Sequence, residues 1–265
     1  MATAATTDRL RQVTVTLAEV FCVVGTLYGV GVLGTRVEES SGGALAADAT
    51  RLAPAGPAFS IWSVIYAGLA AYTIYQWWPG QSTRPVHRRI GWWAAASMVL
   101  NAVWLLVTQQ GWIWGSVLVI VSLAAVLGLL LRALGDVGTD GLSERVVVDG
   151  TFGLYLGWVA VATCANVTAA LVASGVEPAP WLRDLAAVLV LVVVGGLGLV
   201  FARQLRARYA VAAAMAWGLA WIVIGRVGDE PQSMVTAVAA AVAALVVLGA
   251  AVGERRSSGR LDFVR

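Results

Sequence analysis

Apolar segments long enough to cross a lipid bilayer follow one another along almost the whole chain. Each contains roughly the 20 residues that a helix needs to span the hydrocarbon core. A backbone inside lipid must satisfy its own hydrogen bonds, which favours helices over open strands. Short polar segments rich in Pro, Gly and Arg separate the apolar ones. The pattern therefore predicts eight transmembrane helices, at residues 13–34, 58–78, 90–109, 112–131, 146–174, 185–202, 209–225 and 233–252.

The composition supports this interpretation. Of 265 residues, 59% are hydrophobic and 12% are charged, and the mean hydropathy is +0.80. A soluble domain has about 25% charged residues, roughly twice as many. We therefore expect an all-α fold, a polytopic integral membrane bundle in contact with the lipid bilayer.

The arginines predict an orientation. Fourteen of the 18 basic residues fall in the segments that would share a side with both termini, and four fall in the opposite segments. Basic residues are enriched in cytoplasmic segments, so both termini should be cytoplasmic, and we expect a prokaryotic plasma (inner) membrane. The four arginines on the other side are Arg36, Arg51, Arg183 and Arg226.

Several classes of chemistry are disfavoured. The chain contains no lysine, so it cannot form the Schiff base of a retinal protein. Cys22 and Cys164 lie in apolar segments and indicate neither a disulfide nor a metal site. His87 is the single histidine, which excludes haem ligation by two histidines of this chain. We identify no catalytic or metal-binding residues, and the net charge of +3 indicates contact with anionic lipid, not nucleic acid.

Polar and aromatic side chains form a stripe on the fifth predicted helix. Tyr155, Trp158, Ala162 and Asn166 fall within about 80° of one another on a helical projection. An amide in hydrocarbon needs a partner, so this face should point into the bundle. The stripe has two interpretations, a ligand-binding face or ordinary packing between helices.

Other tryptophans lie deep in their predicted helices. Trp62 and Trp104 should share a layer with Trp158 beneath the polar loop 35–57, with Asn101 one turn from Trp104. The alternative is that these indoles face lipid separately. Trp217 and Trp221, one turn apart, indicate a contact face.

Three motifs resemble the tryptophan-rich sensory protein family, also called the translocator or peripheral benzodiazepine receptor family. They occur in the family's order, each on the corresponding helix. They are Phe59-x-x-Trp62-x-x-x-Tyr66 preceded by Pro54, Leu100-Asn101-x-x-Trp104, and Tyr155-x-x-Trp158-x-x-x-Ala162-Thr163-x-x-Asn166.

The resemblance covers about residues 13–174. It implies a five-helix core in residues 1–174, with the 35–57 loop as a lid. Residues 175–265 would add three helices and a cytoplasmic tail that the five-helix members lack. For this extension a packing annex, a dimer surface and a second module remain open, so a homodimer is one of the expected partnerships.

The chain also departs from the family. Leu154 and Ser60 replace prolines usually found near the fifth-helix and second-helix motifs, and Leu105 to Thr108 replace a Ser-Pro and paired phenylalanines. The aromatic and basic residues of a sterol-recognition pattern are absent from residues 169–175. These differences leave the identity of the ligand open.

The resemblance implies a receptor or sensor that binds a flat hydrophobic ligand, above all a tetrapyrrole such as a porphyrin or haem. The resemblance implies no required cofactor. Some bacterial members promote photo-oxidative breakdown of the bound tetrapyrrole, and that activity and transport both stay open. Arg36 and Arg51 in the lid could pair with the propionates of such a ligand. The implied ligand-binding residues are Phe59, Trp62, Tyr66, Asn101, Trp104, Tyr155, Trp158, Ala162 and Asn166.

The alternative is a secondary transporter or a regulator of another lipophilic molecule, such as a sterol, a carotenoid or a lipid. Ionisable residues in membrane helices often mark transport pathways. The candidates here are Glu19, Asp149 and Arg226. We expect Glu19 and Asp149 to lie near the cytoplasmic ends of their helices, and Arg226 to form a local ion pair with Asp229 or Glu230.

Overall fold

The computed structural model describes residues 4–176, 178–205 and 208–262. All regular secondary structure in the described residues is helical, with no strand, and eight helical segments are long and apolar enough to span a membrane, as predicted. The helices are α1 (Ala4–Gly29), α2 (Ile61–Tyr75), α3 (Pro85–Gln109), α4 (Ile113–Val137), α5 (Gly141–Glu144), α6 (Thr151–Ala173), α7 (Pro180–Gln204), α8 (Tyr209–Gly228) and α9 (Met234–Asp262). The described structure also contains two 3-10 helices, η1 (Ser41–Gly43) and η2 (Gly56–Ser60). A π-helix, η3 (Arg145–Gly150), joins α5 to α6.

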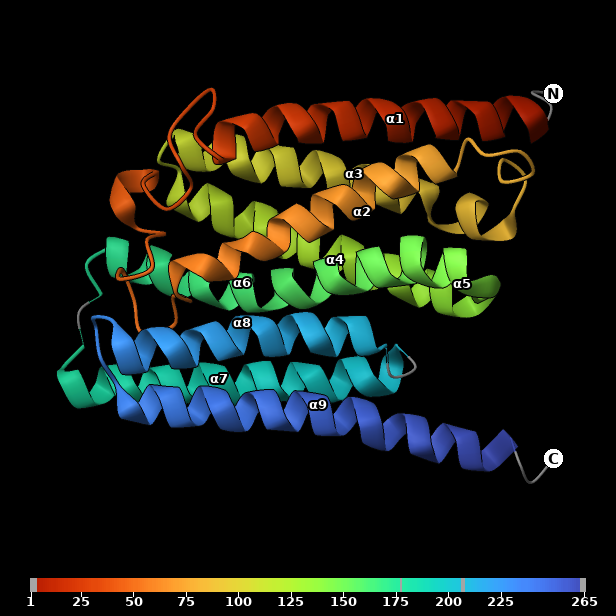
Figure 1. The fold of residues 1–265 in the computed structure, drawn as a ribbon. Coiled ribbons are helices and arrows are strands. Elements are labelled where there is room, and N and C mark those ends of the chain that lie inside the picture. Colours follow the sequence, from red (N-terminus) through yellow and green to blue (C-terminus); the bar gives the residue numbers. More distant parts are fainter. Residues whose placement is uncertain (1–3, 177, 206–207, 263–265) are drawn as a thin grey trace.

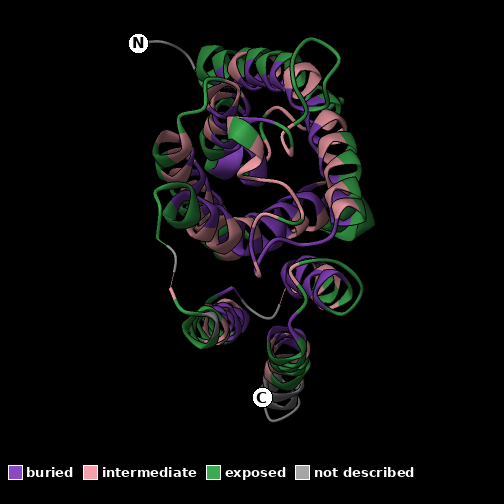
Figure 2. Ribbon diagram, turned by 90° about the vertical axis from the view of Figure 1, so that its left-hand side faces the viewer, coloured by how far each residue is buried: buried purple, intermediate pink, exposed green. Residues whose placement is uncertain are grey.

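Five helices form a ring and three lie outside it. Around the ring, α1 packs on α3, α3 packs on α4, and α4 packs on α6. Helix α2 closes the ring by packing on both α6 and α1 (Figures 1 and 2). The extension attaches through α8, which packs on α6, while α9 packs on both α8 and α7 (Figure 2). Loop 30–60 covers one end of the ring, and both termini lie at the other end (Figure 1). We call this loop the lid.

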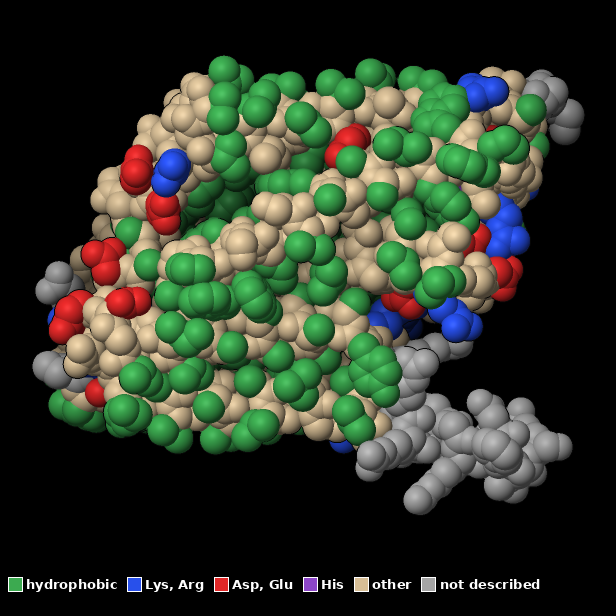
Figure 3. Space-filling view, in the orientation of Figure 1, with side chains coloured by type: hydrophobic (Ala, Val, Ile, Leu, Met, Phe, Trp, Pro, Cys, Tyr) green, Lys and Arg blue, Asp and Glu red, His purple; other side chains and the backbone are tan. Residues whose placement is uncertain are grey.

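The surface matches a membrane protein. In Figure 3 hydrophobic side chains cover much of the visible side of the bundle, and most of the charged side chains in view gather at its two ends. Several tryptophans are exposed near helix ends, among them Trp78, Trp112 and Trp181, and membrane proteins are enriched in tryptophan at their two interfaces. The membrane-embedded sides therefore contact the lipid bilayer.

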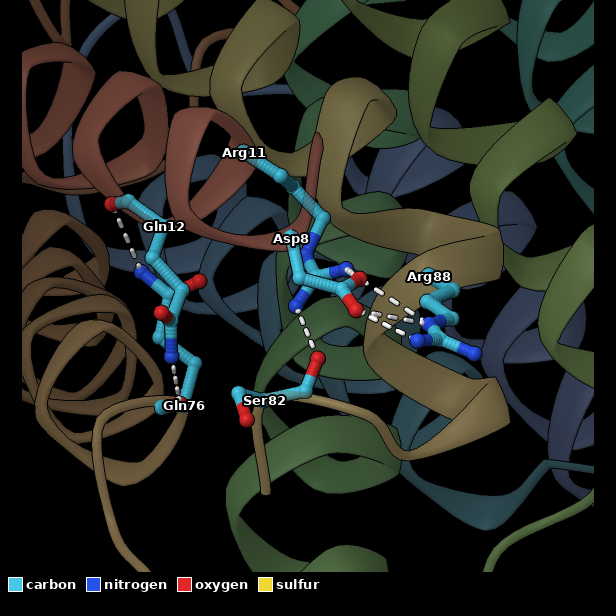
Figure 4. Close-up of polar contacts among 6 residues, drawn as sticks. All are labelled: Asp8, Arg11, Gln12, Gln76, Ser82 and Arg88. Atoms are coloured by element: carbon cyan, nitrogen blue, oxygen red, sulfur yellow. Dashed lines mark hydrogen bonds and ion pairs between the residues drawn. The ribbon is translucent and has the colours of Figure 1, made fainter. Parts of the chain in front are cut away.

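The first helix begins nine residues earlier than predicted, at Ala4 rather than residue 13. The reason is a buried polar cluster (Figure 4), which the order of apolar and polar residues along the chain does not indicate. Asp8 accepts hydrogen bonds from Arg11, at 2.6 Å, and from Arg88 of α3. Arg11 also donates to the carbonyl of Ser82 at 2.7 Å. Contacts to α3 and its preceding loop thus keep a polar sequence helical.

This earlier start corrects the expected position of Glu19. The residue does not lie near a helix end, because α1 extends 15 residues before it and ten after it. Its side chain is 7% exposed, and its Oε2 atom has no hydrogen-bond partner among the described residues. Glu19 is therefore a carboxyl group buried at mid-helix.

Glycines allow close approach at two helix crossings. A Cβ atom on Gly25 of α1 would lie 2.8 Å from Cα of Ala102 in α3, so the absence of a side chain lets these two helices approach closely. At the junction between the ring and the extension, a Cβ on Gly157 of α6 would overlap the carbonyl oxygen of Val211 and lie 2.9 Å from Cβ of Ala214. The α6–α8 contact therefore depends on a residue without a side chain.

We expect Gly157→Ala to lower the free energy of unfolding by about 1–3 kcal/mol, the usual cost of overpacking. Thermal unfolding of the purified protein in detergent would measure it. Gly196→Ala in α7 is the matched control, because a Cβ there meets no atom within 4 Å. Equal stability of both variants would show that the helices can separate without cost.

Candidate ligand-binding site

All nine residues expected at the site lie together at the lid end of the ring. Turn η2 and helix α2 carry the first motif, α3 carries the second, and α6 carries the third. The predicted residues are Phe59, Trp62, Tyr66, Asn101, Trp104, Tyr155, Trp158, Ala162 and Asn166, and each is buried or half-buried. The predicted layer of aromatic and amide groups is therefore present under the lid.

Five aromatic rings form the centre of this layer. Trp62 stacks on Tyr66 with ring centroids 5.2 Å apart, and it meets Tyr155 and Trp158 edge-on at 5.9 and 6.2 Å. Phe59 lies 5.8 Å from Trp158 in the same edge-on geometry. Edge-on and offset contacts are the favoured arrangements of aromatic quadrupoles, so these rings hold one another in place.

Asn166 bridges three helices. Its Oδ1 accepts a hydrogen bond from Nε1 of Trp104 in α3, at 3.0 Å, and its Nδ2 donates to Oγ of Ser116 in α4, also at 3.0 Å. The side chain is 2% exposed. At this position the packing interpretation of the stripe holds, because protein groups on two other helices occupy the amide.

Asn101 makes a second polar link, between α3, α2 and α1. Its Nδ2 donates to the hydroxyl of Tyr66 at 3.2 Å and to Sγ of Cys22 at 3.4 Å. Its Oδ1 is buried and has no partner among the described residues. One acceptor of the site is therefore unoccupied by protein.

Trp158 carries a hydrogen-bond donor without a partner, as Asn101 carries such an acceptor. The ring is 1% exposed, and its Nε1–H has no hydrogen-bond partner among the described residues. A buried N–H without a partner costs roughly 1–3 kcal/mol. Ala162 lies one turn further along α6 and lines the same cavity as Trp158. This part of the stripe is thus free to contact a ligand.

The cavity between the lid and α6 is small because the lid fills it. It has a volume of about 50 Å³, and its walls include Leu45 from the lid, Trp104 and Trp158. A larger cavity of about 290 Å³ lies beside it, bounded by Trp62, Tyr66 and residues of α1. It opens where the face in Figure 3 is hollowed between α1 and α2.

Three side chains, Val37, Phe59 and Trp104, line both cavities. The two spaces are therefore neighbours separated by these three side chains. A further cavity of about 340 Å³, bounded by the lid, α6 and α7, contains none of the nine residues.

Besides Glu19, one more charged residue of the spans differs from expectation. Asp149 forms an ion pair with Arg208 at the end of the bundle away from the lid, so its charge has a partner there. Arg226 forms no ion pair among the described residues, so the predicted local pair with Asp229 or Glu230 is wrong. Its guanidinium instead donates to backbone carbonyls of the lid and of Pro231.

Some residues of the site are not indicated by the sequence pattern. Ser116 and Cys22 hold the two asparagines, but nothing in the sequence pairs a residue of one span with a residue of another. Leu45 is an ordinary apolar residue in a polar loop. A leucine flanked by alanines and glycines in such a loop was the available signal that this segment is buried.

Comparison with family models gives a match to the family described as TSPO-like protein, over residues 13–252. The matched region extends beyond residue 174, through α7 and α8 and into α9. Comparison with curated proteins gives no match, nor does comparison with solved structures.

We expect Asn166→Leu to destabilise the ligand-free protein by about 1–3 kcal/mol, because it leaves the Trp104 indole N–H buried without a partner. Thermal unfolding in detergent would measure the change. Thr168→Val is the matched control on the same helix, since its hydroxyl bonds only back to the Cys164 carbonyl in the described structure. A neutral Asn166→Leu variant would mean that the bridge contributes no stability.

Proposed function

We propose that this chain, which belongs to the TSPO-like protein family, binds a flat hydrophobic ligand between its lid and its helix ring. Membership of this family supports a membrane receptor or sensor role in general terms. The ligand class that we propose is the tetrapyrroles, which have apolar faces and carboxylates at one edge.

The observation that carries the proposal is the unpaired indole N–H of Trp158. It lies inside a layer of aromatic rings, beside the small side chain of Ala162. Aromatic walls with a few unpaired polar groups are typical of small-molecule sites. A macrocycle stacked near Trp104 and Phe59 could accept this hydrogen bond.

The described conformation is closed. Pockets for drug-sized ligands usually have volumes of about 300–1,000 Å³. The two neighbouring cavities have about 50 and 290 Å³, so a macrocycle needs Leu45 and Phe59 to move. The lid must therefore open or slide when the ligand binds.

The carboxylate edge would face the larger cavity. Arg36 lines that cavity and lies 3.9 Å from Glu38, with its side chain 65% exposed. A ligand carboxylate could replace this weak pairing and form a charge-assisted hydrogen bond. Arg51 is a poorer candidate, because it pairs with Asp184 of α7 at 2.7 Å.

We expect Ala162→Leu to weaken binding of a carboxylated porphyrin by about 1–3 kcal/mol, because the added atoms occupy the ligand's space. Trp158→Phe keeps an aromatic ring but removes the donor, and should cost about 1 kcal/mol. Quenching of tryptophan fluorescence would give both affinities.

The control for Ala162→Leu is Ala173→Leu, the same change at an exposed position of α6. Thermal stability of the ligand-free variants is measured in parallel. If Ala162→Leu lowers stability but the folded fraction keeps its affinity, the cavity is not the ligand site and the stripe serves packing alone.

Transport is the second candidate function, and Glu19 is the observation that favours it. A carboxyl group buried in the middle of a membrane-spanning helix is costly and is often part of a proton or ion pathway. The same face of α1 carries Thr26, two turns further on, which lines the larger cavity.

Under this second candidate, the protein in liposomes carries coproporphyrin across the bilayer when a pH gradient is applied, and Glu19→Gln abolishes the flux while binding persists. Uptake measured with the gradient in both directions would decide. Flux equal to that of protein-free liposomes would leave binding and sensing as the function.

A further inference from the structure

The lid contacts the extension as well as the ring. The strongest contact comes from Arg226 in the last turn of α8. Its Nη1 donates to the carbonyl of Thr50 at 3.0 Å, and its Nη2 donates to the carbonyl of Ala47, also at 3.0 Å. The side chain is 1% exposed. A guanidinium offers five donors in a fixed plane, so it can bind several carbonyls at once.

Two tryptophans of α8 hold the next part of the lid. Trp217 Nε1 donates to the carbonyl of Ala58 at 2.9 Å, and the carbonyl of Trp221 accepts a hydrogen bond from the backbone N–H of Ala55 at 3.2 Å. Their rings meet edge-on at 5.6 Å. The contact face expected for this pair is therefore occupied by the lid.

Helix α7 and the residue before α9 contribute a third attachment. Arg51 of the lid pairs with Asp184 of α7 at 2.7 Å, and Ser233 donates to the same carboxylate at 2.6 Å. All three sets of contacts reach residues 47–58, the second half of the lid. We call this half the anchored segment.

The anchored segment directly follows Leu45 and itself contributes Thr50, Ala53 and Pro54 to the lining of the small cavity. Leu45, which lines the small cavity, lies two residues before Ala47. Gly42 and Gly43 come just before it with φ of 67° and 80°, and added Cβ atoms there would meet nothing within 4 Å. A movable joint thus lies on one side of Leu45 and the Arg226 contact on the other.

We infer that the three-helix extension is a latch that holds the lid closed, with Arg226 as its central positioning residue. Through the Ala47 and Thr50 carbonyls it keeps Leu45 in the cavity and so limits how fast the pocket opens. The inference rests on the proposed function for what the pocket binds, but the closure itself involves only groups of this chain. A five-helix bundle without the extension would have no such contacts.

Hydrogen exchange of the ligand-free protein in detergent tests the latch directly. In Arg226→Gln, amides of the lid such as Ala46 and Ala49 should exchange about tenfold faster or more, because charge-assisted hydrogen bonds are lost. Asp184→Asn and Trp217→Phe should each give a smaller increase in the same peptides. Amides of α6 serve as the internal reference for global unfolding.

Arg203→Gln is the matched control, since it removes an exposed arginine at the far end of α7. Lid exchange that is unchanged in Arg226→Gln, or that rises equally with α6 in all three latch variants, would overturn the inference. The second outcome would mean that these residues only stabilise the bundle.

Stopped-flow mixing with coproporphyrin then tests control of access. The latch predicts faster association and faster release in Arg226→Gln than in the Arg203→Gln control. Rates that match the control, despite a faster-exchanging lid, would remove its role in access. If the wild type does not bind coproporphyrin at all, the proposed ligand class is wrong, while the exchange experiment still decides the latch.

Discussion

The structure depends on one constraint, that polar groups buried in a membrane bundle must find partners within the protein. Asn166 satisfies the Trp104 indole and joins α3, α4 and α6. Asn101 links α3 to α2 and α1 in the same way. Because these amides are each shared among three helices, they fix where the helices lie relative to one another. The aromatic layer is then held in the frame that they define.

The same constraint identifies what is unusual. Twelve buried side-chain atoms have no partner among the described residues, and Trp158 Nε1, Asn101 Oδ1 and Glu19 Oε2 are three of them. Two of these three, Trp158 and Asn101, belong to the predicted ligand-binding set, and Trp158 lines the small closed cavity. Their presence is the structural argument for a small-molecule site, and tetrapyrroles remain a proposal for its occupant.

The extension gives this bundle a different organisation from an isolated five-helix ring. Helix α8 packs closely on α6 at Gly157, on the opposite end of the contact from the lid attachments of Arg226. The lid therefore lies between two bodies, and each satisfies part of its backbone. The family match through residue 252 agrees with the extension being part of the family pattern and not an unrelated appendage. Domain boundaries at residue 174 remain a proposal.

The sequence by itself determined the eight helices, the inward stripe of α6 and all nine residues under the lid. These follow from segment length, helical period and local motifs, which are properties of neighbouring positions. Only the tertiary structure decided the early start of α1, the central depth of Glu19 and the partners of Arg226. Asp8 and Arg11 are helical because Arg88 and Ser82 lie beside them. Arg226 has acidic neighbours in sequence but bonds to lid carbonyls more than 170 residues away. Such partners are set by how helices pack, and no local pattern encodes that packing.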